Sequence, residues 1–152
     1  MSKAFYAGSF DPFTVGHLSI VERSLALFDK IYIGVGVNIN KPDAEHEAQS
    51  RVDAIRRAVE GFGDKVEVLS YSGLTYVKAK EAGAEYLLRG LRNSSDFLYE
   101  QQLADVNRRM SGIETVFMMS LPEHASVSSS VVRELERYGA DVSGFVAAKK
   151  QN

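Results

Sequence analysis

The chain alternates short, almost continuous runs of apolar residues with longer stretches in which apolar residues recur every three or four positions. The apolar runs cover residues 4–7, 31–37, 66–69, 86–88 and 116–119, and the run at 31–37 is rich in β-branched residues. Continuous apolar runs are typical of parallel strands that are covered on both faces, because neither face then meets water. The alternation therefore predicts an α/β fold, a five-stranded parallel sheet flanked by helices and joined by right-handed crossovers.

Helical patterns fill the gaps between these predicted strands. They run through residues 18–28, 52–62, 76–82, 96–110 and 131–138. We expect their apolar stripes to lie in the core, those of the last two patterns comprising Phe97, Leu103, Val106, Val131, Val132, Leu135 and Tyr138. The polar residues 42–50 predict a mobile loop that leads into the second helix, and residues 149–152 predict a solvated tail.

Length and charge narrow the class of protein. The chain has 152 residues, so we expect residues 1–152 to form a single domain. The 18 Lys and Arg residues against 20 Asp and Glu residues give a net charge of −2, which lacks the basic excess of many nucleic-acid binders. The aromatic residues also form no stacking array interleaved with Lys or Arg, so we expect no nucleic-acid partner. The absence of Cys excludes disulfides, thiolate catalysis and zinc–sulfur sites.

The N-terminal residues argue against export. A charged residue and Pro12 come too early for the apolar core of a signal peptide, and no window approaches the ~20 apolar residues of a membrane span. We therefore expect a soluble, cytoplasmic protein with no membrane partner.

The first candidate site follows the first predicted strand, in residues 8–17. Gly8 permits a close approach of the backbone to a ligand. Thr14 is a good N-cap and places His17 in the first turn of a helix, where free N–H groups attract phosphate. Gly16 keeps the approach to His17 clear of a side chain. Because His17 would face a ligand cleft, we expect it to contribute little to the core.

Two further clusters also stand at a strand end or a helix start. Arg89 and Arg92 bracket Gly90 after the fourth predicted strand, a pattern that can grip phosphate oxygens and let a nucleotide lie against the backbone. Residues 128–130 are three Ser at a predicted helix start, which can bind a polyphosphate but are more often a simple N-cap. Lys41, after the second strand, can neutralise a transferring phosphate or be merely solvated.

These motifs together resemble one family. The string Gly-Ser-Phe-Asp-Pro followed by T-x-G-H is similar to the signature of phosphopantetheine adenylyltransferases, within the T/H-x-G-H nucleotidyltransferase superfamily. The pattern R-G-x-R with D-F-x-Y-E downstream, and S-S-S-x-x-R, resemble the same family, over about residues 3–145. The chain departs from it at His124, where many members carry an aromatic residue, and at Lys41, which is followed by Pro42 rather than a second Lys.

The resemblance implies a single Rossmann-like domain that transfers the adenylyl group of ATP to 4′-phosphopantetheine, giving 3′-dephospho-coenzyme A and pyrophosphate. It implies that His17 stabilises the transition state, that Lys41 and Arg89 hold the attacking phosphate, that Ser9 touches both substrates and that Thr75 lines the pantetheine arm. Besides Ser9 and His17, the residues implied to bind ATP are Phe10, Gly90, Leu91, Arg92, Glu100, His124, Ala125, Ser126, Val127, Ser128, Ser129 and Ser130.

The resemblance further implies Mg²⁺ that arrives with ATP rather than at a protein-bound site, a homohexamer, and coenzyme A as a feedback inhibitor. Since the attacking phosphate is already an anion, neither a general base nor a covalent intermediate is required.

Two alternatives differ in class. A cytidylyltransferase or a nicotinamide-type adenylyltransferase usually has His where this chain has Thr14, and lacks the R-G-x-R and D-F-x-Y-E pair. A non-catalytic nucleotide-binding module would keep the phosphate-binding groups without turnover.

Overall fold

The computed structural model describes residues 1–148, and its five strands form one parallel sheet in the order β3-β2-β1-β4-β5. The strands are β1 (Lys3–Gly8), β2 (Lys30–Gly36), β3 (Val66–Tyr71), β4 (Tyr86–Leu91) and β5 (Glu114–Met119). The predicted α/β fold with a five-stranded parallel sheet is therefore confirmed. Because the chain adds β2 and β3 on one side of β1 and β4 and β5 on the other, a crevice opens beyond the carboxyl ends of β1 and β4.

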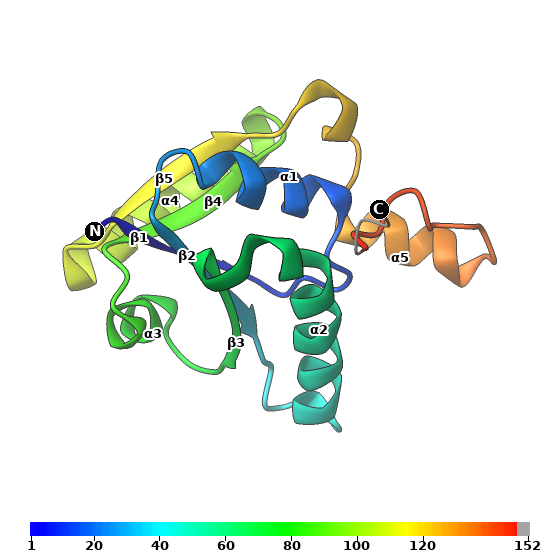
Figure 1. Ribbon diagram of the computed structural model, residues 1–152, viewed down its shortest axis with the longest axis horizontal. Coiled ribbons are helices and arrows are strands. Elements are labelled where there is room, and N and C mark those ends of the chain that lie inside the picture. The colour runs from blue at the N-terminus through cyan, green and yellow to red at the C-terminus, as the bar shows by residue number, and fades with distance from the viewer. Residues whose placement is uncertain (149–152) are drawn as a thin grey trace.

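Five α-helices flank the sheet (Figure 1). They are α1 (Val15–Ser24), α2 (Ala44–Val59), α3 (Thr75–Ala82), α4 (Ser94–Ser111) and α5 (Ser129–Arg137), with 3₁₀ helices at Glu60–Lys65 and Pro122–His124. α5 projects from the body at the right of Figure 1. The chain beyond it returns to the start of α1, where Val146 forms a bridge with Thr14.

The core consists of two clusters, one on each face of the sheet. Ile20 of α1 and Ile55 of α2 belong to the larger cluster, whose buried residues are at most 9% exposed. Phe5 and Ala79 belong to the smaller cluster on the opposite face, beneath α3. Each fully buried aliphatic or aromatic side chain contributes about 1.5–3 kcal/mol, so both faces hold the sheet and fix the ends of its strands.

The loop predicted for residues 42–50 is wrong from Ala44 onward, because α2 begins there. Only Ala48 of this first part is buried, Ala44 is half-buried, and the remaining side chains are polar and exposed. With one small inward residue there was no apolar stripe to detect, although Ala, Glu and Gln are good helix formers. The tail predicted for residues 149–152 lies outside the described residues.

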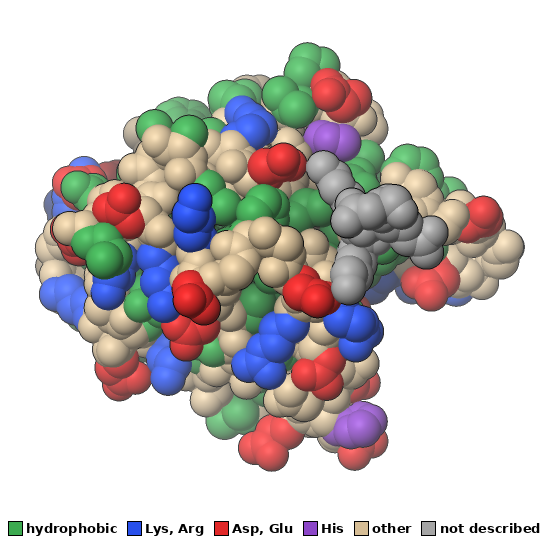
Figure 2. All heavy atoms as spheres, in the orientation of Figure 1, with side chains coloured by type: hydrophobic (Ala, Val, Ile, Leu, Met, Phe, Trp, Pro, Cys, Tyr) green, Lys and Arg blue, Asp and Glu red, His purple; other side chains and the backbone are tan. Residues whose placement is uncertain are grey.

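The apolar stripes of α4 and α5 are not core in this chain, contrary to expectation. Phe97 is 42% exposed and Val106 55%, and on α5 Tyr138 is 78% exposed. Of the α5 stripe only Val132 is buried. Figure 2 shows hydrophobic side chains at the surface where α5 projects. A helical stripe predicts an apolar face, but it does not say whether that face is buried, and within residues 1–148 most of this one is exposed.

No helix in residues 1–148 combines the length and hydropathy that a membrane crossing requires.

Candidate active site

The junction between β1 and α1 is fixed by a reciprocal cap. The Thr14 Oγ1 atom accepts a hydrogen bond from the His17 backbone N–H at 3.3 Å, and the Thr14 backbone N–H donates to His17 Nδ1 at 2.9 Å. The predicted N-cap at Thr14 and the first-turn position of His17 are confirmed. Because Nδ1 accepts a hydrogen bond from a backbone N–H, the proton of the neutral imidazole lies on Nε2. That N–H is the donor left for a ligand.

The ring of His17 is part of an aromatic cluster. It stacks on Phe13 at 5.5 Å between ring centroids and meets Phe10 edge-on at 5.0 Å. Burial lowers the pKa of His17 to about 4, and the charges of Arg89 and Arg92 act in the same direction. His17 is therefore a neutral donor at neutral pH. The expectation that it contributes little to the core was wrong, since it both caps α1 and packs on two rings.

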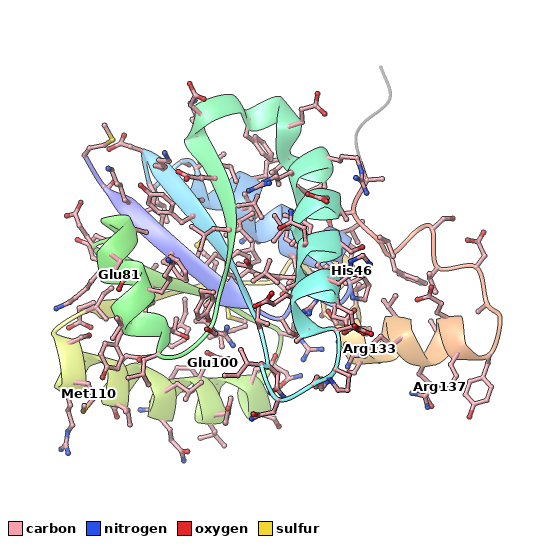
Figure 3. The ribbon with its side chains drawn as sticks, turned by 90° about the horizontal axis from the view of Figure 1, so that it is seen from below. His46, Glu81, Glu100, Met110, Arg133 and Arg137 are labelled. Atoms are coloured by element: carbon pink, nitrogen blue, oxygen red, sulfur yellow. The ribbon has the colours of Figure 1, made fainter. Side chains whose placement is uncertain are left out.

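The loop between β1 and α1 is held from outside by other helices. Arg51 of α2 donates to the Ser9 carbonyl at 2.6 Å, and Arg133 of α5 donates to the Asp11 carbonyl at 2.6 Å. The Ser129 hydroxyl donates to the Pro12 carbonyl at 2.8 Å. Figure 3 labels Arg133, on the first part of α5. Sequence reasoning missed Arg51, whose partner lies 42 residues away.

Gly8 and Phe10 have structural roles beyond those expected. A Cβ atom on Gly8 would lie 3.0 Å from the ring of Phe10, so Gly8 makes room for that ring, and it also lines the α1 and α4 cavities. Phe10 is itself only 3% exposed and adopts a left-handed φ of 47°. Its side chain is therefore mainly a core residue that supports the ring of His17.

Arg89, at the carboxyl end of β4, is held by a buried carboxylate. Its Nε and Nη2 atoms donate to the two oxygens of Glu100 at 2.8 and 2.6 Å, and its Nη1 donates to the Ala7 carbonyl. Burial alone would lower the pKa of Arg89, but the hydrogen bonds and charge of Glu100 outweigh it and the pKa is raised. Glu100, 7% exposed on α4, thus fixes a permanent cation at the sheet edge (Figure 3).

Arg92 is fixed in a similar way but nearer the surface. Its Nε atom lies 3.2 Å from Asp96 Oδ2, which also accepts from the Arg92 backbone N–H at 3.0 Å. Leu91, between the two cations, is 5% exposed, so its side chain belongs to the core and only its backbone can meet a ligand.

A cavity of about 230 Å³, here called the α1 cavity, opens at this edge. It brings together nine of the predicted site residues: Ser9, Phe10, His17, Arg89, Gly90, Arg92, Glu100, Val127 and Ser129. The first turn of α1 also lines it through Thr14 and Gly16. A helix N-terminus, a neutral imidazole donor and a fixed cation together make a site for phosphate.

A second cavity of about 500 Å³, the α4 cavity, lies between α3 and α4. Thr75 lines it, as predicted, and the Thr75 hydroxyl is 2.8 Å from that of Tyr71. Leu74, Leu103 and Val106 give it apolar walls, and sequence reasoning did not select them. Ser9, Arg89 and Glu100 line both this cavity and the α1 cavity, so the two meet there.

Lys41 is separate from both cavities. It lines a third one of about 250 Å³, the α2 cavity, together with Arg51 and Arg133. Ser9 lines this cavity as well and connects it with the other two. The structure therefore brings Lys41 close to the site only through the α2 cavity.

Only part of the segment from His124 to Ser130 reaches the α1 cavity. Ser128 is the N-cap of α5 and accepts from the Val131 N–H at 3.2 Å, which is the simpler of the two roles considered for it. His124 lies beside the start of α1, since its Cβ would be 3.6 Å from a Cβ on Gly16. Ser130 is exposed. Of this segment, Val127 and Ser129 line the α1 cavity, whereas the remaining residues line none of the three cavities.

Comparisons with known proteins agree with this geometry. Residues 5–135 match the cytidylyltransferase-like family model. The chain is 46% identical to the phosphopantetheine adenylyltransferase of Cytophaga hutchinsonii over 154 residues, covering 98% of this chain and 99% of the relative. It is 42% identical to the protein of that name from Bacteroides thetaiotaomicron over 146 residues, covering 96% and 95%.

A solved structure shares the fold. The bifunctional NMN adenylyltransferase/ADP ribose pyrophosphatase of Francisella tularensis superposes with a TM-score of 0.69 at 14% identity, over 98% of this chain and 46% of that one. At this identity the likeness concerns the fold alone. From its sequence relatives, its family model and its site, this chain belongs to the phosphopantetheine adenylyltransferase family of cytidylyltransferase-like proteins.

Proposed function

We propose that this chain transfers the adenylyl group of ATP to 4′-phosphopantetheine, giving 3′-dephospho-coenzyme A and pyrophosphate in coenzyme A biosynthesis. The observation that carries the proposal is the meeting of two unlike cavities at Ser9 and Arg89. The α1 cavity offers phosphate-binding groups, and the α4 cavity offers apolar walls for an arm such as pantetheine. The names of the relatives support the same pair of substrates.

The chemistry needs position and charge rather than a base. A phosphate oxygen of the acceptor forms a bond to the α-phosphorus of ATP, and the bond from that phosphorus to the bridging oxygen of pyrophosphate breaks. The attacking oxygen is already anionic, so no proton has to be removed. The His17 Nε2–H and the first-turn amides of α1 would stabilise the charge that grows on the α-phosphate.

In this proposal the cationic side chains bind the phosphate groups of the two substrates. Arg89, fixed by Glu100, would hold the acceptor phosphate where the two cavities meet, and Lys41 would assist from the α2 cavity. Ser9 would touch both substrates. Arg92, the Gly90 and Leu91 backbone, and Val127 and Ser129 would contact ATP.

Magnesium enters the proposal only with ATP. Residues 1–148 contain no group of three His, Asp or Glu side chains placed to hold a metal ion. Phosphate oxygens and water would therefore supply most ligands of Mg²⁺, which neutralises charge on the leaving pyrophosphate. Coenzyme A contains the adenylyl part and the phosphopantetheine part of the product, so we expect it to inhibit by filling the α1 and α4 cavities.

The exposed apolar faces of α4 and α5 support assembly into the homohexamer that the family resemblance implies. A cytoplasmic location remains a prediction.

An acceptor panel in a pyrophosphate-release assay tests the activity. With ATP, we expect turnover with 4′-phosphopantetheine and none with nicotinamide mononucleotide, and dephospho-coenzyme A identified by mass. Turnover with nicotinamide mononucleotide instead would favour the other adenylyltransferase class. ATP binding without pyrophosphate release from any acceptor would favour a non-catalytic module.

The assignment of Arg89 has its own test. Arg89→Ala should raise the KM for phosphopantetheine more than the KM for ATP. Equal weakening of both would contradict the assignment of Arg89 to the acceptor phosphate.

A further inference from the structure

The hydroxyl of Tyr6 is a polar group of the α1 cavity that the proposed mechanism leaves unused. Tyr6 lies on β1, is 4% exposed, and lines the α1 cavity with His17 and Arg89. The polar atoms around it are already engaged, because Arg89 is held by Glu100 and His17 Nδ1 by Thr14. Within residues 1–148 the Tyr6 hydroxyl has no hydrogen-bond partner.

The Tyr6 hydroxyl is not one of the polar groups that are sealed from solvent without a hydrogen-bond partner. The sealed side-chain oxygens without a partner in the described chain are those of Ser24 and Thr115. The oxygen of Tyr6 is not among them, and its residue forms part of the cavity wall. The hydroxyl therefore opens onto a space where a ligand atom can reach it.

The position of the hydroxyl is fixed. The Tyr6 ring meets Phe10 edge-on at 5.1 Å between centroids and lies 6.4 Å from the ring of His17. Its oxygen is 3.7 Å from the point where a Cβ on Gly90 would stand. The hydroxyl therefore lies beside the Gly90 backbone at the edge of the α1 cavity.

The hydroxyl is also fixed in its protonation. Burial raises the pKa of Tyr6; the charge of Arg89 opposes this and that of Glu100 adds to it. The group is therefore a neutral phenol that can donate one hydrogen bond. Buried polar groups are rarely left without a partner, so an open, unpaired donor is expected to meet an acceptor on a ligand.

We propose that Tyr6 is a substrate-contacting residue, whose hydroxyl donates a hydrogen bond to an oxygen atom of the nucleotide bound in the α1 cavity. The proposal rests on the proposed function in taking that nucleotide to be ATP. The proposal assigns this contact to bound ATP in the ground state. It therefore contributes to ATP affinity and leaves the acceptor in the α4 cavity untouched.

The test removes one oxygen atom. Tyr6→Phe should weaken ATP binding in calorimetry roughly tenfold and raise the KM for ATP by the same factor. The kcat should stay within about threefold of wild type, the KM for phosphopantetheine should not change, and the melting temperature should not fall. Tyr32→Phe is the matched control, since Tyr32 is 6% exposed on the neighbouring strand β2 and lines none of the three cavities.

ATP binding by Tyr6→Phe within about twofold of wild type would overturn the proposal, and so would a lowered melting temperature with unchanged ATP affinity, which is the result of a purely structural role. Failure of the proposed function gives a different result. A wild-type protein that binds ATP but forms no dephospho-coenzyme A would refute the reaction, while the calorimetric comparison would still decide the role of Tyr6.

Discussion

The α1 and α4 cavities share Ser9, Arg89 and Glu100, yet the other residues that line them differ in chemical character. The α1 cavity presents directed donors on rigid supports, a helix start and an imidazole locked by its own cap. The α4 cavity presents apolar side chains of α3, α4 and the loop before α3. Directed donors can stabilise a charge that appears at one atom, whereas apolar walls gain free energy in proportion to the area they cover. Loss of the His17 donor from the first cavity should therefore affect the rate, whereas substitutions in the apolar walls of the second should affect acceptor binding.

His17→Ala should give the largest effect and most sharply separate the two cavities. Loss of a donor to developing charge typically costs on the order of 10²–10³ in kcat, or roughly 3–4 kcal/mol. The KM for either substrate should change far less. The variant should also lose about 1–3 kcal/mol of stability, because the hydrogen bond from the Thr14 N–H to the imidazole and the ring contacts with Phe10 and Phe13 disappear. Steady-state kinetics and denaturant unfolding measure the two losses.

His17→Gln separates these losses. Gln at this helix position can still accept from the Thr14 N–H, so the reciprocal cap is retained. The Gln side-chain amide also keeps a donor on the side of the phosphate, so we expect kcat between those of His17→Ala and wild type, with part of the stability restored. ATP affinity that falls in step with kcat would make His17 a ground-state ligand and contradict its transition-state role.

The protonation of His17 should make the free energy of unfolding depend on pH. Its folded-state pKa of about 4 lies below the usual 6.5, so between these values the unfolded chain binds more protons. The contribution of His17 to stability is therefore complete above about pH 6.5 and is lost as the pH falls toward 4, at roughly 1.4 kcal/mol per pH unit. Denaturant unfolding of wild type and His17→Gln at several pH values should show this slope only in wild type. Equal slopes would mean that His17 is not held neutral.

Glu100→Gln tests the junction of the two cavities. It removes the charge that balances Arg89, which should lower the free energy of unfolding by about 2–3 kcal/mol. Because Arg89 would hold the acceptor phosphate and also lines the α1 cavity, the KM for phosphopantetheine should rise more than the KM for ATP. A rise in the KM for ATP alone, with unchanged stability, would instead make Glu100 a direct nucleotide ligand.

The parts that could be predicted from sequence are those that local rules decide. A Thr three residues before a His at a strand-to-helix junction sets both the cap and the position of His17. The apolar runs determined the strands because a strand covered on both faces must be apolar throughout. The pairing of Arg89 with Glu100 obeys no such rule, since the two lie eleven residues apart on a strand and a helix.

The same limit explains the α4 stripe. Phe97, Leu103 and Val106 are the apolar residues of a polar-rich helical pattern, and the pattern does not say what covers each of them. In the structure Leu103 and Val106 line the α4 cavity and Phe97 is exposed. Periodicity detects an apolar face equally well when its partner is a core, a ligand or another chain.

Leu103→Asp should give the smallest effect and is the most selective test of the α4 cavity. Leu103 is 38% exposed, so its replacement should leave the fold intact. A carboxylate in this wall would remove apolar contact with the pantetheine arm and should raise the KM for phosphopantetheine roughly tenfold. The KM for ATP and kcat should not change, because no group of the α1 cavity is altered.

Leu98→Asp is the control, since Leu98 is 65% exposed on the same helix and does not line the α4 cavity. If both variants raise the KM for phosphopantetheine equally, the effect is one of charge on α4 rather than contact. If Leu103→Asp lowers kcat at saturating substrates, the apolar wall also positions the acceptor phosphate, and the α4 cavity then serves the rate as well as acceptor binding.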